Sequence, residues 1–199
     1  KSAKDELEKE ILSQKAEMTR STNEIWMTKN ILNDHEQYSR RECLEIKGVP
    51  MHRVEDTNKI VKDVGKLIGV EIKDTDLSIS HRLTAPDPSF KQPPAIIVKF
   101  ARRDVRNNLY AAKKNLRNKS SRDIGYVREN PQKLFISESL TQRNRKLFNK
   151  CLQAKYDLKF KFLWTTHGKI LARKDELNPP VHISNEKDLK KFTEQLRSS

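Results

Sequence analysis

The segment that decides the fold is PAIIVKF (residues 94–100), in which aliphatic and aromatic residues follow a proline pair. Such a run predicts a strand, because β-branched side chains pack well on a pleated sheet and prolines interrupt the ladder before it. Side chains alternate across a strand, so Ile96, Val98 and Phe100 share one face. Lys99 lies on the other face. The one aromatic residue of this strand therefore belongs with the aliphatic side chains.

Three elements are predicted upstream of this strand. Residues 43–50 (CLEIKGVP) alternate apolar and polar side chains and stop at a Gly/Pro turn, which indicates a first strand. Asp56 is a typical helix N-cap, and residues 56–69 place apolar side chains on one helical face. Residues 77–83 alternate again as a second strand. A proline-rich loop at residues 84–94 leads into the third strand.

Downstream, residues 103–118 have the apolar spacing of a helix, and residues 133–137 (KLFIS) predict a fourth strand. The resulting order is β-α-β-β-α-β, the split βαβ of ferredoxin-like domains and of RNA-recognition motifs. We therefore expect an α+β protein with an atypical RNA-recognition-motif domain at residues 41–138. Its first and third strands lack exposed aromatic residues, so stacking on this sheet is not expected to be the main binding mode.

Residues 139–199 predict a small α/β C-terminal domain that binds nucleic acid. Thr141 caps a helix that runs to about Tyr156, and a last helix runs from Asn185 to Leu196. Three short strands are expected between them, at residues 161–164, 169–172 and 181–183. A piece of this size is small for independent stability, so we expect it to lean on the preceding domain.

The N-terminal segment, residues 1–40, predicts a coiled coil. Residues 3–37 contain neither Pro nor Gly, and apolar side chains recur every seven residues at the a positions. The alternative is a single amphipathic helix that packs on its own downstream domain. Most d positions are polar, so the heptad does not decide between two and three strands. The predicted oligomerisation residues are Leu7, Ile11, Met18, Ile25 and Leu32.

The chain is strongly basic, with a formal net charge of +14. Residues 1–40 hold 7 Lys or Arg and 8 Asp or Glu, so the whole positive excess lies downstream. A field of this sign attracts nucleic acid or an anionic membrane surface, although a solvated lysine-rich surface would give the same composition. Trp164 lies among basic residues and either stacks on a base or belongs to the core of the small domain. The predicted nucleic-acid-binding residues are Arg82, Lys91, Lys99, Arg102, Arg103, Lys113, Lys114, Arg143, Arg145, Lys146, Trp164 and Lys169.

No catalytic constellation or cofactor motif is visible in the sequence. The five histidines are scattered, and glycine-rich phosphate loops and nucleophile motifs are missing. Cys43 and Cys151 lie far apart without metal-ligand spacing, so we expect no metal site and no cofactor. No signal peptide, lipidation motif or apolar run of membrane-spanning length is present. We therefore expect a non-enzymatic intracellular protein that does not bind membranes.

The succession of short motifs resembles the first-open-reading-frame protein of LINE-type (non-LTR) retrotransposons. These motifs are SRR (39–41) ahead of GVP (48–50), then IIVKF (96–100), AAK (111–113) and ESLT (138–141). The resemblance implies a coiled-coil homotrimer whose two domains wrap single-stranded RNA, with single-stranded DNA as a second ligand. It also implies nucleic-acid chaperone activity in cytoplasmic ribonucleoprotein particles, with the nucleus as a second location. Matching family positions are Arg82, Lys99, Lys113, Arg145 and Trp164.

The sequence thus predicts a protein that packages retrotransposon RNA as a homotrimer. Two alternatives from other classes stay open. One is a coiled-coil adaptor whose globular half binds an acidic protein partner. The other is a duplex DNA-binding protein, which would prefer one duplex over random single strands.

Overall fold

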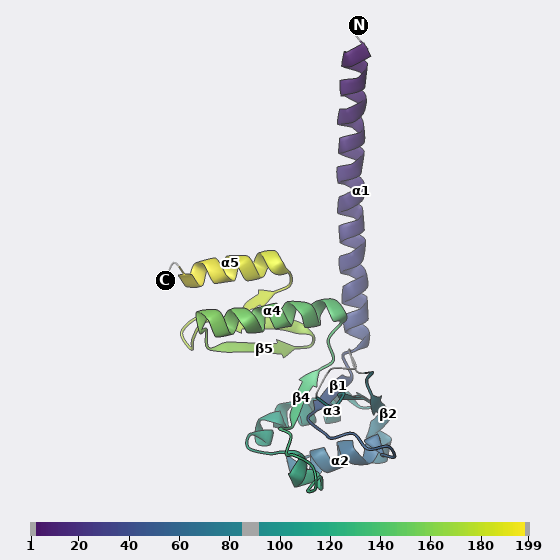
Figure 1. Cartoon of the computed structure of the whole chain (residues 1–199), viewed down its shortest axis with the longest axis vertical. Coiled ribbons are helices and arrows are strands. Elements are labelled where there is room, and N and C mark those ends of the chain that lie inside the picture. Colours follow the sequence, from purple (N-terminus) through teal and green to yellow (C-terminus); the bar gives the residue numbers. More distant parts are fainter. Residues whose placement is uncertain (1–2, 85–91, 198–199) are drawn as a thin grey trace. The chain divides into compact units, whose positions relative to one another are not determined.

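A computed structural model describes residues 3–84 and 92–197 and divides the chain into two compact units, Lys1–Tyr38 and Ser39–Ser199 (Figure 1). The first unit consists of one uninterrupted helix, α1 (Ala3–Ser39), as the absence of Pro and Gly predicts. No described residue within α1 is buried, and the heptad a residues Ile11, Met18, Ile25 and Leu32 are each more than half exposed. The apolar stripe of this helix therefore faces solvent in the single chain.

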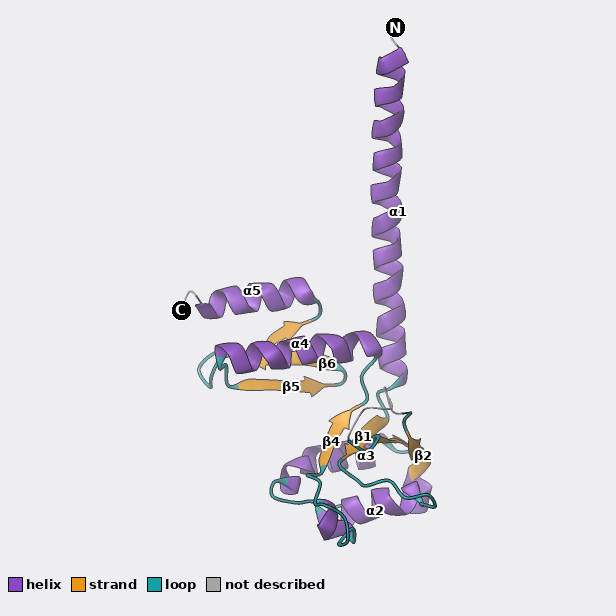
Figure 2. Cartoon of the chain, in the orientation of Figure 1, coloured by secondary structure: helices purple, strands orange, loops and turns teal. Residues whose placement is uncertain are grey.

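The second unit begins with a four-stranded antiparallel sheet and two helices (Figure 2). Its elements follow the predicted β-α-β-β-α-β order, and the strands lie side by side as β2-β3-β1-β4. An α+β fold is confirmed. The elements are β1 (Cys43–Lys47), α2 (Thr57–Leu67), β2 (Leu77–Arg82), β3 (Ile96–Phe100), α3 (Arg103–Ala112) and β4 (Phe135–Glu138), with 3-10 turns at Asp74–Asp76, Lys113–Leu116 and Ser121–Ile124.

Strand β3 has the faces that its alternation predicts. Ile96, Val98 and Phe100 are fully buried in the hydrophobic core, whereas Lys99 is exposed on the outer face. Helix α2 begins after Asp56, whose carboxylate accepts a hydrogen bond from the Lys59 amide, as expected for an N-cap. The buried apolar faces of α2 and α3 complete the same core.

Several predicted boundaries differ from the structure, and three of them have a clear local reason. The first strand stops at Lys47 because Gly48 takes a left-handed conformation (φ 84°). A Cβ on Gly48 would lie 2.0 Å from the Lys133 carbonyl oxygen, so only glycine fits there. Lys133 forms an isolated bridge with Ser120, which leaves β4 to begin at Phe135. Helix α3, predicted over residues 103–118, ends at Ala112 and continues as a 3-10 turn over Lys113–Leu116.

The C-terminal part contains a three-stranded antiparallel sheet in the order β5-β6-β7. Its elements are α4 (Gln142–Leu158), β5 (Phe162–Thr166), β6 (Lys169–Arg173), β7 (Val181–Ile183) and α5 (Glu186–Arg197). Thr141 caps α4 as predicted, because its hydroxyl accepts a hydrogen bond from the Asn144 amide. Helices α4 and α5 pack side by side against one face of the sheet, around Cys151, Ile170 and Phe192 (Figure 1).

A buried carboxylate joins the two sheets of this unit. Glu138, at the end of β4, accepts hydrogen bonds from the amides of His167 (3.0 Å) and Gly168 (2.9 Å) in the β5–β6 turn. It also pairs with the buried guanidinium of Arg106 at 2.7 Å. Burial alone would raise the pKa of Glu138, but the hydrogen bonds from Arg106 and the Gly168 amide outweigh it and lower that pKa. The carboxylate is therefore held in its charged form.

Candidate nucleic-acid interface

The structure gives Arg82 an internal role that the sequence did not reveal. Its guanidinium pairs with Glu55 at 2.7 Å and donates to the carbonyl oxygens of Val49, Pro50 and Pro94. All three nitrogens are used, and the side chain is only 11% exposed. Arg82, predicted as a phosphate contact, is thus engaged inside the protein, where it joins the backbone at residues 49–50 and at Pro94 with the side chain of Glu55.

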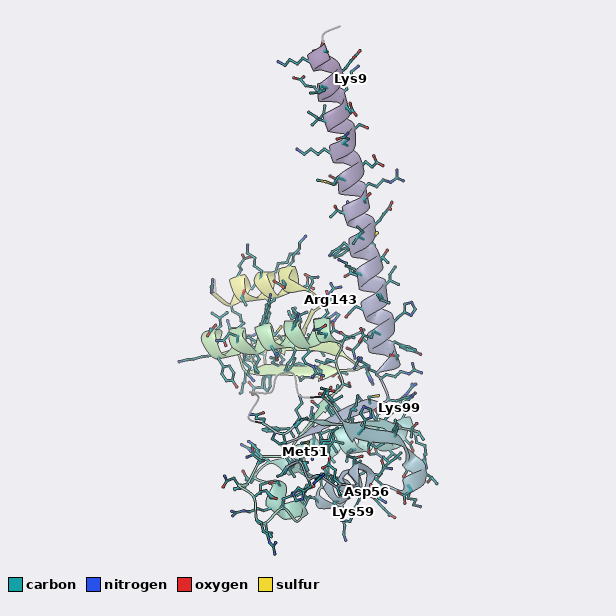
Figure 3. The ribbon with its side chains drawn as sticks, turned by 45° about the vertical axis from the view of Figure 1, so that its right-hand side comes forward. Lys9, Met51, Asp56, Lys59, Lys99 and Arg143 are labelled. Carbon is teal, nitrogen blue, oxygen red and sulfur yellow. The ribbon has the colours of Figure 1, made fainter. Side chains whose placement is uncertain are left out.

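The other predicted cations of the first part are spread over several elements. Arg102 pairs with Asp104 at 2.5 Å, and Arg103 lies 3.6 Å from Glu42. Both arginines are more than half exposed, and such surface pairs are weak enough for a phosphate to replace the carboxylate. Lys99 projects from the outer face of β3 (Figure 3). Lys91 lies outside the described residues.

Lys113 and Lys114 follow helix α3 in a 3-10 turn. The Lys113 ammonium lies 3.7 Å from the centre of the Tyr110 ring, a cation–π contact. The Tyr110 hydroxyl in turn lies 3.1 Å from the carbonyl oxygen of Thr165 on β5. Lys113 is thereby placed next to the three-stranded sheet.

The face of the three-stranded sheet that points away from α4 and α5 presents aromatic and basic side chains. Residues directly opposite each other on paired strands share a face. Trp164 is opposite Leu171, Phe162 is opposite Arg173, and Thr166 is opposite Lys169. The next strand adds His182 beside Leu171. We call this surface the open sheet face.

Trp164 lies outside the hydrophobic core of the C-terminal part. That core consists of side chains from the other face, including Ile170 and Ile183, together with those of α4 and α5. Trp164 is only partly buried, and Phe162 beside it lies 5.3 Å from the guanidinium carbon of Arg173. Of the two alternatives for Trp164, a stacking position is the one that this geometry favours.

A second aromatic group was missed by the sequence analysis. Phe135 lies on edge strand β4, is half exposed, and stands opposite Lys47 of β1. The Lys133 ammonium lies 5.4 Å from the centre of the Phe135 ring. Together with Arg145, these residues line a groove of about 360 Å³ that also borders Pro93 and Pro94. The alternation of KLFISE was the available signal, because it separates Phe135 from the buried Ile136.

Arg145 reaches this groove from helix α4 and pairs with a buried acid. Its guanidinium lies 2.5 Å from the carboxylate of Glu45, which is 1% exposed on β1. The Ser139 hydroxyl donates to the same carboxylate oxygen at 3.2 Å, and the Lys47 ammonium lies 3.6 Å from the other oxygen. A buried carboxylate requires such partners. Since Arg145 is still 43% exposed, part of its guanidinium faces the groove.

Arg143 and Lys146 do not join Trp164. They lie on α4, on the other side of the three-stranded sheet, and line a separate cavity of about 400 Å³. The predicted residues of the C-terminal part thus divide among three places: the open sheet face, the Phe135 groove and the α4–α5 cavity.

Two further features to consider are a metal centre and a membrane-spanning helix. No three His, Cys, Asp or Glu side chains gather there as a metal ion would require. No helix in residues 3–84 or 92–197 combines the length and the apolar character that crossing a bilayer demands.

These features define an α+β protein with a strongly basic globular unit and aromatic rings that are half-exposed or partly buried. Within it, residues 141–193 match the family model described as baculovirus FP protein domain 2. The matched segment spans α4 through most of α5, so it includes both Trp164 and the α4–α5 cavity. No curated protein matches the chain.

The match corrects the resemblance drawn from the sequence. The assignment to LINE-type retrotransposon proteins is wrong, since the family model that matches is of baculovirus type. The labels retrotransposon, LINE and RNA-recognition motif therefore do not hold as family assignments, and nothing now supports the three-chain stoichiometry and chaperone activity that came with them. The physical reason is that motifs such as IIVKF and AAK are short strand and helix patterns that unrelated α+β domains share.

Proposed function

We propose that this protein binds single-stranded nucleic acid, RNA or DNA, by stacking bases on exposed aromatic rings and holding phosphates with flanking cations. One observation supports this above all others. Trp164 and Phe162 lie on the open sheet face beside Lys169 and Arg173, whereas the core of the same part is built on the opposite face. Stacking on such rings is worth about 1–3 kcal/mol per base.

The Phe135 groove supports the same proposal from the four-stranded part. It pairs one half-exposed ring with three cations, Lys47, Lys133 and Arg145. The element order and the strand order β2-β3-β1-β4 correspond to a ferredoxin-like arrangement. The groove lies at its edge strand β4, while Glu45 on the outer face is buried and pairs with Arg145 of α4. Bases of a duplex are already stacked on each other, so exposed rings favour single strands over duplexes.

We further propose that α1 assembles copies of the chain through a coiled coil. Its a residues are exposed in the single chain and would be buried between helices. Linking several binding units in this way raises the apparent affinity for a long strand. In the full chain, Ile25→Asp would place a charge in the buried layer of every copy. Light scattering should then report a smaller mass than for the unaltered chain, whose mass gives the strand number; an unchanged mass would contradict the proposal.

The test of nucleic-acid binding is fluorescence anisotropy on the full chain with labelled single-stranded RNA, single-stranded DNA and duplex DNA across a salt series. We expect tighter binding to the single strands and a linear fall of log affinity with log salt, as phosphates release counterions. Preference for one duplex would favour the duplex-binding alternative. Weak binding to all three at low salt, with capture of an acidic polypeptide, would favour the adaptor alternative.

A further inference from the structure

We infer that the cavity between the first turns of α4 and α5 is a second nucleic-acid contact, which takes a backbone phosphate and does not recognise bases. This inference rests on the proposed function. The cavity holds about 400 Å³ and is lined by Arg143, Lys146 and Lys150 of α4, with Ser184 and Asn185 ahead of α5. Small-ligand sites occupy about 300–1,000 Å³, so a phosphate with its sugar fits.

Three cations converge here because of their spacing along the helix. Residues three and four positions apart lie on one helical face, so Arg143, Lys146 and Lys150 form a single row. Figure 3 labels Arg143 on this helix. Lys150 pairs with Glu186 at 2.6 Å. In the described part of the chain neither Arg143 nor Lys146 has a carboxylate within 4.0 Å, and both are exposed. Two positive charges are therefore left for an anion.

The side-chain cations, and not the helix ends, provide the recognition. Side chains already occupy part of the first-turn amides of both helices: the Thr141 hydroxyl accepts from the Asn144 amide, and the Asn185 side chain accepts from the amides of Lys187 and Asp188. A ligand would thus be held by charge-assisted hydrogen bonds from the guanidinium and ammonium groups, which suit phosphate oxygens.

The lining also explains why bases are not expected in this cavity. No aromatic side chain borders it, and Leu147 is its one apolar lining residue among those described. Trp164 and Phe162 lie on the open sheet face, on the other side of the β5-β6-β7 sheet from α4 and α5. The C-terminal part therefore has a base-stacking side and a phosphate-binding side, and a bound strand contacts the second independently of its sequence.

The test compares two double variants of the full chain, each of which removes two positive charges from the layer formed by α4 and α5. Arg143→Gln with Lys146→Gln empties the cavity of its free cations. The matched control, Lys155→Gln with Lys191→Gln, changes lysines on the same helices that do not line the cavity. Melting curves establish that both variants fold.

We expect the cavity variant to bind single-stranded RNA of any sequence about tenfold more weakly at 0.1 M salt. Each lost phosphate contact lowers the salt slope by about 0.7 for single strands, so the slope should become shallower by about 1.4. The control should change the slope by less than about half of that. Equal losses of affinity and salt slope in the two variants would show that positive charge anywhere on these helices contributes equally. That result would overturn the inference.

Two further arms separate the possible outcomes. If the cavity variant loses binding to a poly-glutamate peptide but keeps its RNA affinity and salt slope, the cavity takes carboxylates and the inference fails. Combining the cavity variant with Trp164→Ala should multiply the two losses, because the sites lie on opposite sides of the sheet. A failure of the proposed function looks different, since the unaltered chain would then bind no single strand even at low salt.

Discussion

The outer faces of the two sheets differ in the side chains that their central strands place there. On the four-stranded sheet, β1 places Glu45 on the outer face, buried and paired with Arg145. On the three-stranded sheet, β6 places Leu171 between Trp164 and His182, and cations surround them. Both faces belong to the same strongly basic unit. The positions of acids and aromatic rings, more than the number of Lys and Arg, therefore distinguish the proposed binding face from a structural one.

The largest effect is expected where the two sheets are joined. Glu138→Ala removes the acceptor of Arg106 and of two turn amides, and leaves a buried guanidinium unpaired. Breaking one partner of a buried ion pair costs about 3–5 kcal/mol. Urea denaturation should show this loss in the free energy of unfolding. A change below about 1 kcal/mol would mean that the two sheets do not depend on this joint.

Removing the indole ring tests the open sheet face itself. Trp164→Ala should weaken binding to single-stranded RNA by about 1–3 kcal/mol with little change in salt slope, because stacking is lost and phosphate contacts are kept. Phe135→Ala should have a similar but smaller effect, since a phenyl ring offers a base less stacking area than an indole ring.

A melting curve run beside the binding assay distinguishes stacking from packing. A tryptophan in a core would cost about 3–5 kcal/mol of stability when truncated to alanine. Unchanged melting of Trp164→Ala with reduced affinity supports the open sheet face as a binding platform. Loss of stability of core size would make Trp164 a packing residue.

The contribution of Glu138 to the stability of the protein should also decrease in acid. The pKa of Glu138 is lowered in the folded protein, so its stabilising contribution is fully present above the ordinary value of 4.5 and is lost as the pH falls through the folded pKa. One group contributes no more than about 1.4 kcal/mol per pH unit. The difference in the free energy of unfolding between the unaltered chain and Glu138→Gln isolates the contribution of the Glu138 carboxylate. The two pH profiles should converge as the pH falls; parallel profiles would contradict it.

The smallest effect is expected on the outer face of the four-stranded sheet, at Glu45. Glu45→Gln removes a negative charge beside Arg145 and Lys47 while keeping the shape of the side chain. Both cations then become available to phosphate in the Phe135 groove, and affinity for single strands should rise about threefold, or roughly 0.7 kcal/mol. Anisotropy at low salt measures this, with Glu71→Gln as a control at an exposed acid that does not line the groove. A fall in affinity would show that Glu45 positions Arg145 for binding.

The order of the helices and strands follows from local patterns in the sequence. Alternation over residues 94–100 fixed which face of β3 is buried, and Asp56 and Thr141 marked where two helices begin. These features are local, because strand alternation, helical spacing and capping involve residues within a few positions of one another. The same local motifs could not identify the family, and the resemblance built on them was wrong.

The tertiary structure alone decided what the charged side chains do. Arg82 pairs with Glu55, which is 27 residues away in the sequence, and Arg145 pairs with Glu45, which is 100 residues away. Phe135 meets Lys47 only because β4 pairs with β1, and Arg143 is separated from Trp164 only because α4 packs on the far face of the sheet. Side-chain partners across such distances depend on strand register and on layer packing, which no local pattern specifies.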